Sequence, residues 1–349
     1  MIKRILYTLL IMFPVVASAQ INTDRVMAIG RNALYFEDYV LSIQYFNQVI
    51  NAKPYLSDPY FYRGLAKINL DDFQGAESDC SEAIERNPFV VSAYQVRGLA
   101  RIQQNNFAGA IEDYTKALEF DPENIGVWHN MALCRIRQED YKGAKNDLDK
   151  LIAISPRYTK AYLMRGEVDL KQKDTLAAEK DFGKAIEIDR YDADTWASRA
   201  ILRLQQQRYK DAEADFDHAI RLSTRNSGVY INRALARYHQ NNLRGAMSDY
   251  DIALDIDPNN FIGHYNRGLL RAQVGDDNRA IQDFNFVIEM EPDNMMAIFN
   301  RGLLLDQTGD YKGAIKDYST VINEYPNFLL GYQYRAQARR KIGDVKGAD

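Results

Sequence analysis

The sequence predicts an all-α fold in which one helix-turn-helix unit is repeated with a fixed period along most of the chain. Apolar residues recur at spacings of three and four in two runs per unit, separated by a short polar turn, which indicates two amphipathic helices. No stretch alternates with period two for long enough to predict a sheet. A small residue recurs every 34 positions without insertion or deletion, at Gly30, Gly64, Gly98, Ala132, Gly166, Ala200, Ala234, Gly268, Gly302 and Ala336. Twelve positions after it, an alanine recurs at Ala76, Ala110, Ala144, Ala178, Ala212, Ala246, Ala280, Ala314 and Ala348.

The segment before Gln20 stands apart from the repeats. Lys3 and Arg4 precede an apolar run over residues 5–16, and a small-residue segment follows just before Gln20. This order is typical of a secretory signal peptide, so we expect residues 1–19 to be removed and the protein to be exported to the periplasm or cell envelope. The alternative is an uncleaved anchor, but a membrane-spanning helix needs about 20 apolar residues. After signal removal we expect no membrane span.

Residues 20–349 are predicted to form a single array of nine full repeats, 23–328, and a truncated tenth, 329–349. Close approach of the two helices explains why a small residue recurs inside the first helix, where glycine is otherwise unfavourable. The tenth unit stops before its second helix is complete. We therefore expect the natural protein to continue, or a further domain or partner to cover the open C-terminal end. The second helices should end at a proline, which cannot continue a helix, as in Pro54, Pro88, Pro122, Pro156, Pro258, Pro292 and Pro326.

The order of aromatic, small, alanine, aromatic and proline positions over residues 23–349 resembles the tetratricopeptide repeat (TPR) family, and the signal-like start suggests an exported bacterial member. Trp128 and Trp196 occupy the same aromatic position of their units. The resemblance implies a right-handed superhelical solenoid whose concave wall comes from the first helices. It also implies binding of a protein or an extended peptide in that groove.

Composition excludes several function classes. Without Lys3 and Arg4 the chain has 42 basic and 48 acidic side chains, a net charge of −6, which argues against nucleic acid as a partner. The sequence contains no motif of a common hydrolase, nucleotide-binding or zinc site, and we expect no cofactor, no metal and no catalysis. Cys80 and Cys134 fall at core positions and are interpreted as buried thiols. His264 occupies the aromatic position and is interpreted as a packing residue.

An arginine precedes the small residue in eight units, at Arg63, Arg97, Arg165, Arg199, Arg233, Arg267, Arg301 and Arg335. In seven of these units an aspartate stands 16 positions after the arginine, in the predicted second helix. These residues are Asp79, Asp113, Asp181, Asp215, Asp249, Asp283 and Asp317. Repeat four keeps Asp147 opposite Met131. We interpret this pattern as a ladder of ion pairs between the two helices of each unit. The alternative is a charged strip for an acidic ligand, but the matched acids would neutralise it.

Three consecutive units carry an asparagine just before the arginine, at Asn232, Asn266 and Asn300. An amide offers the donor and the acceptor that an extended peptide backbone requires. The arrangement is similar to the asparagine ladder of O-linked N-acetylglucosamine transferase, where such residues face the groove. The surrounding positions expected to face the groove are apolar: Ile231, Leu235, Tyr265, Leu269, Phe299 and Leu303 in these units, and Phe61, Leu99, Leu133, Leu163 and Ile201 in earlier ones. If exposed, they form a patch that marks a protein partner.

These features favour a non-catalytic scaffold of the cell envelope that binds a protein or peptide through repeats seven to nine. A first alternative is the repeat arm of a longer enzyme or envelope-assembly factor whose active segment lies beyond residue 349. A second alternative, a carbohydrate binder, rests on the 23 tyrosines, most of which are explained by packing. The triplet from Asp174 to Leu176 resembles an O-glycosylation site at Thr175 used by some secreting bacteria.

Overall fold

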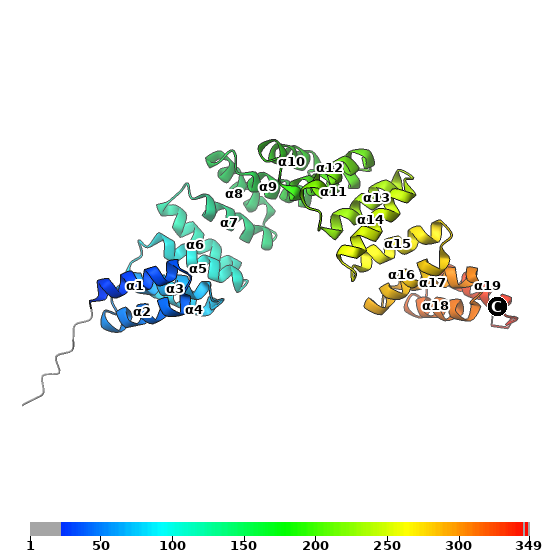
Figure 1. Ribbon diagram of the computed structural model, residues 1–349, viewed down its shortest axis with the longest axis horizontal. Coiled ribbons are helices and arrows are strands. Elements are labelled where there is room, and N and C mark those ends of the chain that lie inside the picture. The colour runs from blue at the N-terminus through cyan, green and yellow to red at the C-terminus, as the bar shows by residue number, and fades with distance from the viewer. Residues whose placement is uncertain (1–21, 345, 348–349) are drawn as a thin grey trace, which may run out of the picture. The chain divides into compact units, whose positions relative to one another are not determined.

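The computed structural model describes residues 22–344 and 346–347. Within these residues the chain forms 19 α-helices and no strand, which confirms the all-α prediction. The predicted signal peptide, residues 1–19, lies outside the described residues, as does Ala348 of the alanine ladder. The chain divides into two compact units, one ending at Pro156 and the other starting at Arg157, and each is described by itself (Figure 1).

The first unit contains four hairpins stacked in chain order. Each odd-numbered helix packs against the next even-numbered helix, which in turn packs against the first helix of the next hairpin. The helices are α1 (Thr23–Tyr35), α2 (Tyr39–Ala52), α3 (Asp58–Ile68), α4 (Phe73–Arg86), α5 (Val91–Gln103), α6 (Phe107–Phe120), α7 (Ile125–Arg137) and α8 (Tyr141–Ile154).

The second unit contains five hairpins and one further helix, stacked in the same way. The first helices begin at the predicted unit starts in both units, except that α3 begins one residue late. The helices are α9 (Thr159–Lys171), α10 (Thr175–Ile188), α11 (Ala193–Gln205), α12 (Tyr209–Leu222), α13 (Ser227–His239), α14 (Leu243–Ile256), α15 (Phe261–Gln273), α16 (Asp277–Met290), α17 (Met295–Thr308), α18 (Tyr311–Glu324) and α19 (Leu329–Lys341).

The turn inside each hairpin has a common construction. In repeat three, Asn105 has a left-handed backbone with φ of 59°, and Asn106 then accepts a hydrogen bond from the backbone of Gly109. The asparagine side chain thereby satisfies one of the free N–H groups at the start of the second helix. Helices α10 and α12 end where the pattern expects a proline although Arg190 and Thr224 stand there. Proline is therefore not required to end these second helices.

The small-residue position brings the two helices of a hairpin into contact, as predicted. A Cβ atom added at Gly166 would lie 2.6 Å from the ring of Phe182, and one added at Gly98 would lie 2.8 Å from the ring of Tyr114. Both rings are completely or almost completely buried.

Cys80 is also buried in this core, and burial raises the pKa of its thiol to about 12. Its interpretation as a buried core thiol is confirmed, and so is that of Cys134.

Candidate partner-binding site

In five repeats the ladder arginine joins three helices, and repeat seven is an example. Arg233 on α13 donates from Nε to Asp249 Oδ2 at 2.9 Å and from Nη2 to Asp249 Oδ1 at 2.6 Å, which pairs it with α14 of its own hairpin. Its remaining nitrogen, Nη1, donates to Asp217 Oδ1 at 2.7 Å on α12 of the preceding hairpin. Asp249 is only 1% exposed. The guanidinium therefore fixes successive second helices to each other as well as to the first helix.

Pairing within each unit confirms the predicted ladder. Arginine and aspartate form the same ion pair in Arg63–Asp79, Arg97–Asp113, Arg165–Asp181, Arg199–Asp215, Arg267–Asp283 and Arg301–Asp317. The third contact, to the preceding hairpin, was not predicted. Its acceptor differs between units and is Asn47, Ser81, Asp251 or Asn285 in four of the others.

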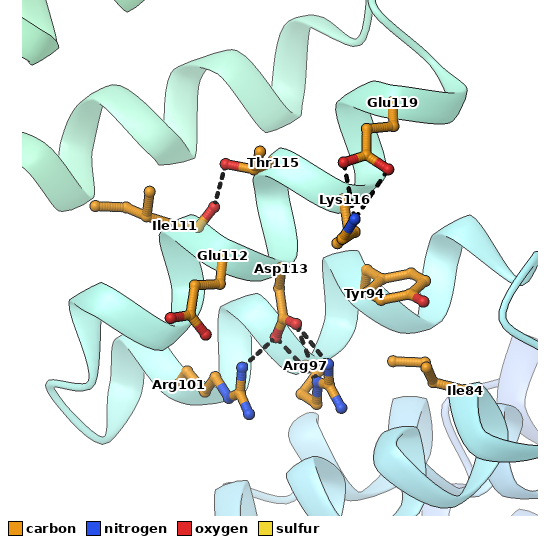
Figure 2. Close-up of a pocket in the computed structure, with 10 residues that line it drawn as sticks. All are labelled: Ile84, Tyr94, Arg97, Arg101, Ile111, Glu112, Asp113, Thr115, Lys116 and Glu119. Carbon is orange, nitrogen blue, oxygen red and sulfur yellow. Dashed lines mark hydrogen bonds and ion pairs between the residues drawn. The ribbon is translucent and has the colours of Figure 1, made fainter.

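A second basic residue, four positions after the ladder arginine, was also missed. Figure 2 shows Asp113 between Arg97 and Arg101, and Arg101 Nη1 donates to Asp113 Oδ2 at 3.0 Å. In repeat four, Arg135 occupies this second position and donates to Asp147 at 2.7 Å, which explains how Asp147 is paired although Met131 replaces the ladder arginine. The signal in the sequence was the spacing of four, which places both bases on one face of the first helix.

The cavity in Figure 2, of about 650 Å³, lies over this ladder between α4, α5 and α6. Its charged groups other than Glu112 pair with one another: Arg97 and Arg101 with Asp113, and Lys116 with Glu119 at 2.9 Å. Such mutual neutralisation supports the structural interpretation of the ladder over the charged strip for an acidic ligand.

His264 completes the same scheme in repeat eight. Its Nε2 lies 3.0 Å from the carbonyl of Pro258, and its Nδ1 lies 3.1 Å from Asp283 Oδ1. Trp128 makes the equivalent bond to the carbonyl of Pro122. The packing role predicted for His264 is therefore confirmed. Burial alone would raise the pKa of Asp283, but hydrogen bonds from His264 and the neighbouring arginines hold it below its usual value.

The predicted asparagines do not all have the same environment. Asn300 on α17 donates from Nδ2 to the hydroxyl of Tyr265 on α15 at 3.1 Å, so part of its amide is used within the protein. Among the described residues, the side chains of Asn232 and Asn266 have no hydrogen-bond partner, and both are partly exposed. These two amides are therefore the ones available to a ligand.

The predicted apolar surface needs a correction. Ile231 and Phe299 are only 7% and 9% exposed and belong to the hydrophobic core. They are buried because a first helix packs against the following hairpin as well as its own; the ring of Phe299, for example, contacts Phe328, which precedes α19. The prediction that Ile231 and Phe299 lie on the surface was therefore wrong. Leu269 is 39% exposed, and the other predicted residues of these repeats, Leu235, Tyr265 and Leu303, are partly buried.

The second position of the first helix, which was not predicted, adds exposed apolar area. Ile262 on α15 is 50% exposed and Met296 on α17 is 60% exposed. Positions two, six and nine of a helix lie on one face because they are three or four residues apart. We call this face of α13, α15 and α17 the first-helix surface; it contains Ile262, Met296, Asn232, Asn266, Leu235, Leu269 and Leu303.

No group of three or more histidine, cysteine or acidic side chains with a geometry for a metal ion occurs among the described residues. In the same part of the chain, no helix has the length and apolar character to cross a membrane.

Asp174 of the predicted glycosylation triplet caps α10 by accepting from the backbone of Ala177. Thr175 and Leu176 are exposed, and modification of Thr175 stays a prediction.

Comparison with known proteins supports the repeat assignment. A family model described as TPR repeat matches residues 98–134, and models described as tetratricopeptide repeat match residues 125–158, 159–192, 198–261 and 265–327. No curated protein matches the chain in sequence.

Solved structures share the fold at low sequence identity. A TPR protein from Parabacteroides merdae is 21% identical and aligns with a TM-score of 0.54 over 71% of this chain and 98% of its own. The C-terminal part of a TPR repeat-containing protein from Cytophaga hutchinsonii is 17% identical, with a TM-score of 0.56 over 68% and 97%. PilF of Pseudomonas aeruginosa is 18% identical, with a TM-score of 0.56 over 62% and 98%. The chain therefore belongs to the tetratricopeptide repeat family, whose stacked hairpins serve as protein–protein interaction scaffolds.

Proposed function

We propose that this chain is a non-catalytic scaffold of the cell envelope that binds an extended segment of a partner protein across the first-helix surface of repeats seven to nine. The observation that carries the proposal is the pair of unpartnered amides, Asn232 and Asn266, which lie one repeat apart and on the same face as exposed apolar side chains. An amide that has no partner inside the protein can both donate to and accept from a peptide backbone.

The surrounding chemistry is consistent with a polypeptide ligand. The arginines of these repeats are already paired with buried aspartates, so the surface offers amides and apolar side chains rather than free cations. Leu269 and Met296 are exposed beside the amides. Apolar side chains next to backbone-binding groups suit an extended peptide, in which alternate side chains point toward the surface while the backbone forms hydrogen bonds.

Export is proposed from the order of charged, apolar and small residues in residues 1–19. Its test is to express the full chain with a C-terminal tag in its native host and to compare the envelope and cytoplasmic fractions. An envelope form that begins at Gln20 by N-terminal sequencing supports the proposal. A cytoplasmic form that retains residues 1–19 contradicts it.

The binding proposal is tested by site-specific crosslinking followed by affinity measurement. A photo-crosslinking amino acid at Leu269 should capture a partner in the cell envelope, whereas the same group at Asn278, an exposed residue of α16, should not. Mass spectrometry then identifies the partner and the crosslinked segment, which is synthesised as a peptide.

Affinity for that peptide is measured by calorimetry with the double variant Asn232→Ala/Asn266→Ala. Two lost hydrogen bonds of about 1 kcal/mol each should raise Kd about 30-fold. Asn278→Ala serves as the matched control and should leave Kd unchanged. Undiminished affinity of the folded double variant would contradict the role of the amides.

A further inference from the structure

A cavity of about 400 Å³ opens beside the first turn of α17, within the second unit. It lies between the start of α17, the end of α18 and the segment that leads into α19. The wall of the cavity includes an apolar floor of Phe299, Val321 and Phe328. Met296, Tyr325 and Asp293 lie at its rim. Met296 also belongs to the first-helix surface, so the cavity adjoins the proposed peptide-binding face.

The cavity lies at a boundary where repeat nine departs from the chain's own pattern at one lining position. Tyr325 is the C-cap residue that follows α18 and is 56% exposed. The residue at the same position of the other eight complete repeats is polar in every case: Lys53, Asn87, Asp121, Ser155, Asp189, Ser223, Asp257 and Glu291. An exposed aromatic ring has therefore replaced a solvated polar side chain at this one boundary.

Phe328, the residue that precedes α19, is a second apolar residue at this boundary. Its side chain makes no capping hydrogen bond. At the four preceding boundaries an aspartate or asparagine accepts a bond from the helix backbone, and losing such a cap costs about 1 kcal/mol: Asp192, Asn226, Asn260 and Asn294. Val90 and Tyr158, at the same position before α5 and α9, make no such bond either. An exposed aromatic ring at a position that is polar in every other complete repeat indicates a function.

The charge around the cavity has one sign. The two segments that line it, residues 293–299 and 321–328, contain Asp293 and Glu324 and no lysine, arginine or histidine. Asp293 is exposed at the rim, and among the described residues its carboxylate has no hydrogen-bond or ion-pair partner. A cationic group beside the cavity would therefore be favoured.

We propose that this cavity binds one large apolar side chain of a partner polypeptide that carries a lysine or arginine next to it. The floor supplies rigid apolar contact, because Phe299 packs against Phe328 with ring centroids 5.0 Å apart and Val321 is buried. The volume lies at the lower end of the range of ligand pockets, which suits a single side chain and its adjoining backbone. The inference rests on the proposed function, because it adds an anchor at the end of the same first-helix surface.

The experiment uses residues 20–349 with ¹³C-labelled methionine methyl groups and three synthetic heptapeptides as probes. The sequences are Gly-Ser-Lys-Phe-Lys-Ser-Gly, the same peptide with alanine in place of phenylalanine, and the same peptide with glutamates in place of both lysines. Titration followed by NMR should shift the Met296 methyl signal with the first peptide. Each of the other two should bind at least tenfold more weakly.

Tyr325→Ser restores the serine that stands at this position in repeats four and six, so it should preserve folding and weaken the first peptide at least tenfold. Met290→Ser removes an exposed side chain that does not line the cavity and should leave binding unchanged. Unaltered binding to folded Tyr325→Ser, or equal binding of the phenylalanine and alanine peptides, overturns the inference.

The double variant Asn232→Ala/Asn266→Ala separates this inference from the proposed function. It should weaken the natural partner but leave the Met296 response to the phenylalanine peptide intact. If partner binding depends on the asparagines and the phenylalanine peptide gives no shift, only the cavity inference fails. If the phenylalanine peptide binds and the partner is indifferent to the asparagines, the proposed surface fails while the cavity remains.

Discussion

Replacing Arg233 by methionine tests whether the arginine ladder stabilises the array. The substitution keeps an apolar side chain but removes two hydrogen bonds to Asp249 and one to Asp217. Asp249 keeps the bond that Arg237 Nη1 donates to its Oδ2 at 2.8 Å, whereas its Oδ1 loses the donor that Arg233 supplied. The variant therefore leaves Oδ1 of Asp249, a residue only 1% exposed, without the donor that Arg233 supplied.

The expected loss follows from these contacts. A hydrogen bond to a charged group contributes about 1.5–3 kcal/mol, and breaking one side of a buried ion pair costs about 3–5 kcal/mol. Arg237 still compensates part of the charge on Asp249, so the lower end of the second range applies. We expect the free energy of unfolding around α13 and α14 to fall by about 3 kcal/mol.

The assay has to resolve local stability, because stacked repeats do not unfold as a single two-state unit. Hydrogen exchange followed by mass spectrometry gives the opening free energy of α13 and α14 separately from that of distant hairpins. A loss of about 3 kcal/mol corresponds to exchange about 100-fold faster in these two helices. Peptides from α9 and α10 should change much less.

Arg335→Met is the matched control. Arg335 holds the same position on α19, but its contacts are a 3.5 Å approach to Ser319 Oγ and the face of the Tyr332 ring. Its substitution should change stability by no more than about 0.5 kcal/mol. The double variant Arg233→Met/Asp249→Leu removes both charges and should recover at least half of the loss. Unchanged protection in Arg233→Met, or a double variant as unstable as the single one, would refute the reasoning.

Three further predictions concern packing, reactivity and pH. Gly166→Ala should lower the melting temperature, because its methyl group would overlap a buried ring at a cost of about 2 kcal/mol. Gly183→Ala, in open space on α10, should raise stability by up to about 1 kcal/mol. A higher melting temperature for Gly166→Ala than for Gly183→Ala would contradict this prediction. The Cys80 thiol, whose pKa burial raises to about 12, should react with Ellman's reagent at pH 8 only upon unfolding; rapid reaction of the native protein would show that it is accessible. Burial opposes ionisation of Asp283, but hydrogen bonds led by the one from His264 hold its pKa below the value in the unfolded chain. The ionised carboxylate therefore stabilises the folded state, and this stabilisation should be lost as the pH falls below about 4. Asp283→Asn should flatten this acid-side loss in urea titrations, and an unaltered acid limb would argue against it.

The repeat period was sufficient to predict the helices and the pairing of each arginine with the aspartate on the second helix of its own unit. Both depend on contacts within one hairpin, whose geometry the spacing of apolar residues determines. Contacts between hairpins were harder to predict. Ile231 and Leu235 are both apolar and lie one turn apart on α13, yet Ile231 is buried and Leu235 is partly exposed. The difference depends on how the next hairpin stacks, which the period alone does not specify.

The asparagines show what can be inferred once a single inter-hairpin contact is known. Asn300 bonds to Tyr265, which precedes it by 35 residues. At the same distance before Asn266 stands Ile231, and the residue at that distance before Asn232 is an alanine; neither side chain offers an acceptor. Because neighbouring hairpins of the second unit stack on each other in chain order, the identity of the residue at this earlier position decides whether the amide is used within the fold or remains available to a ligand. The sequence thus contains this distinction, but it becomes readable only after one contact has been located in the structure.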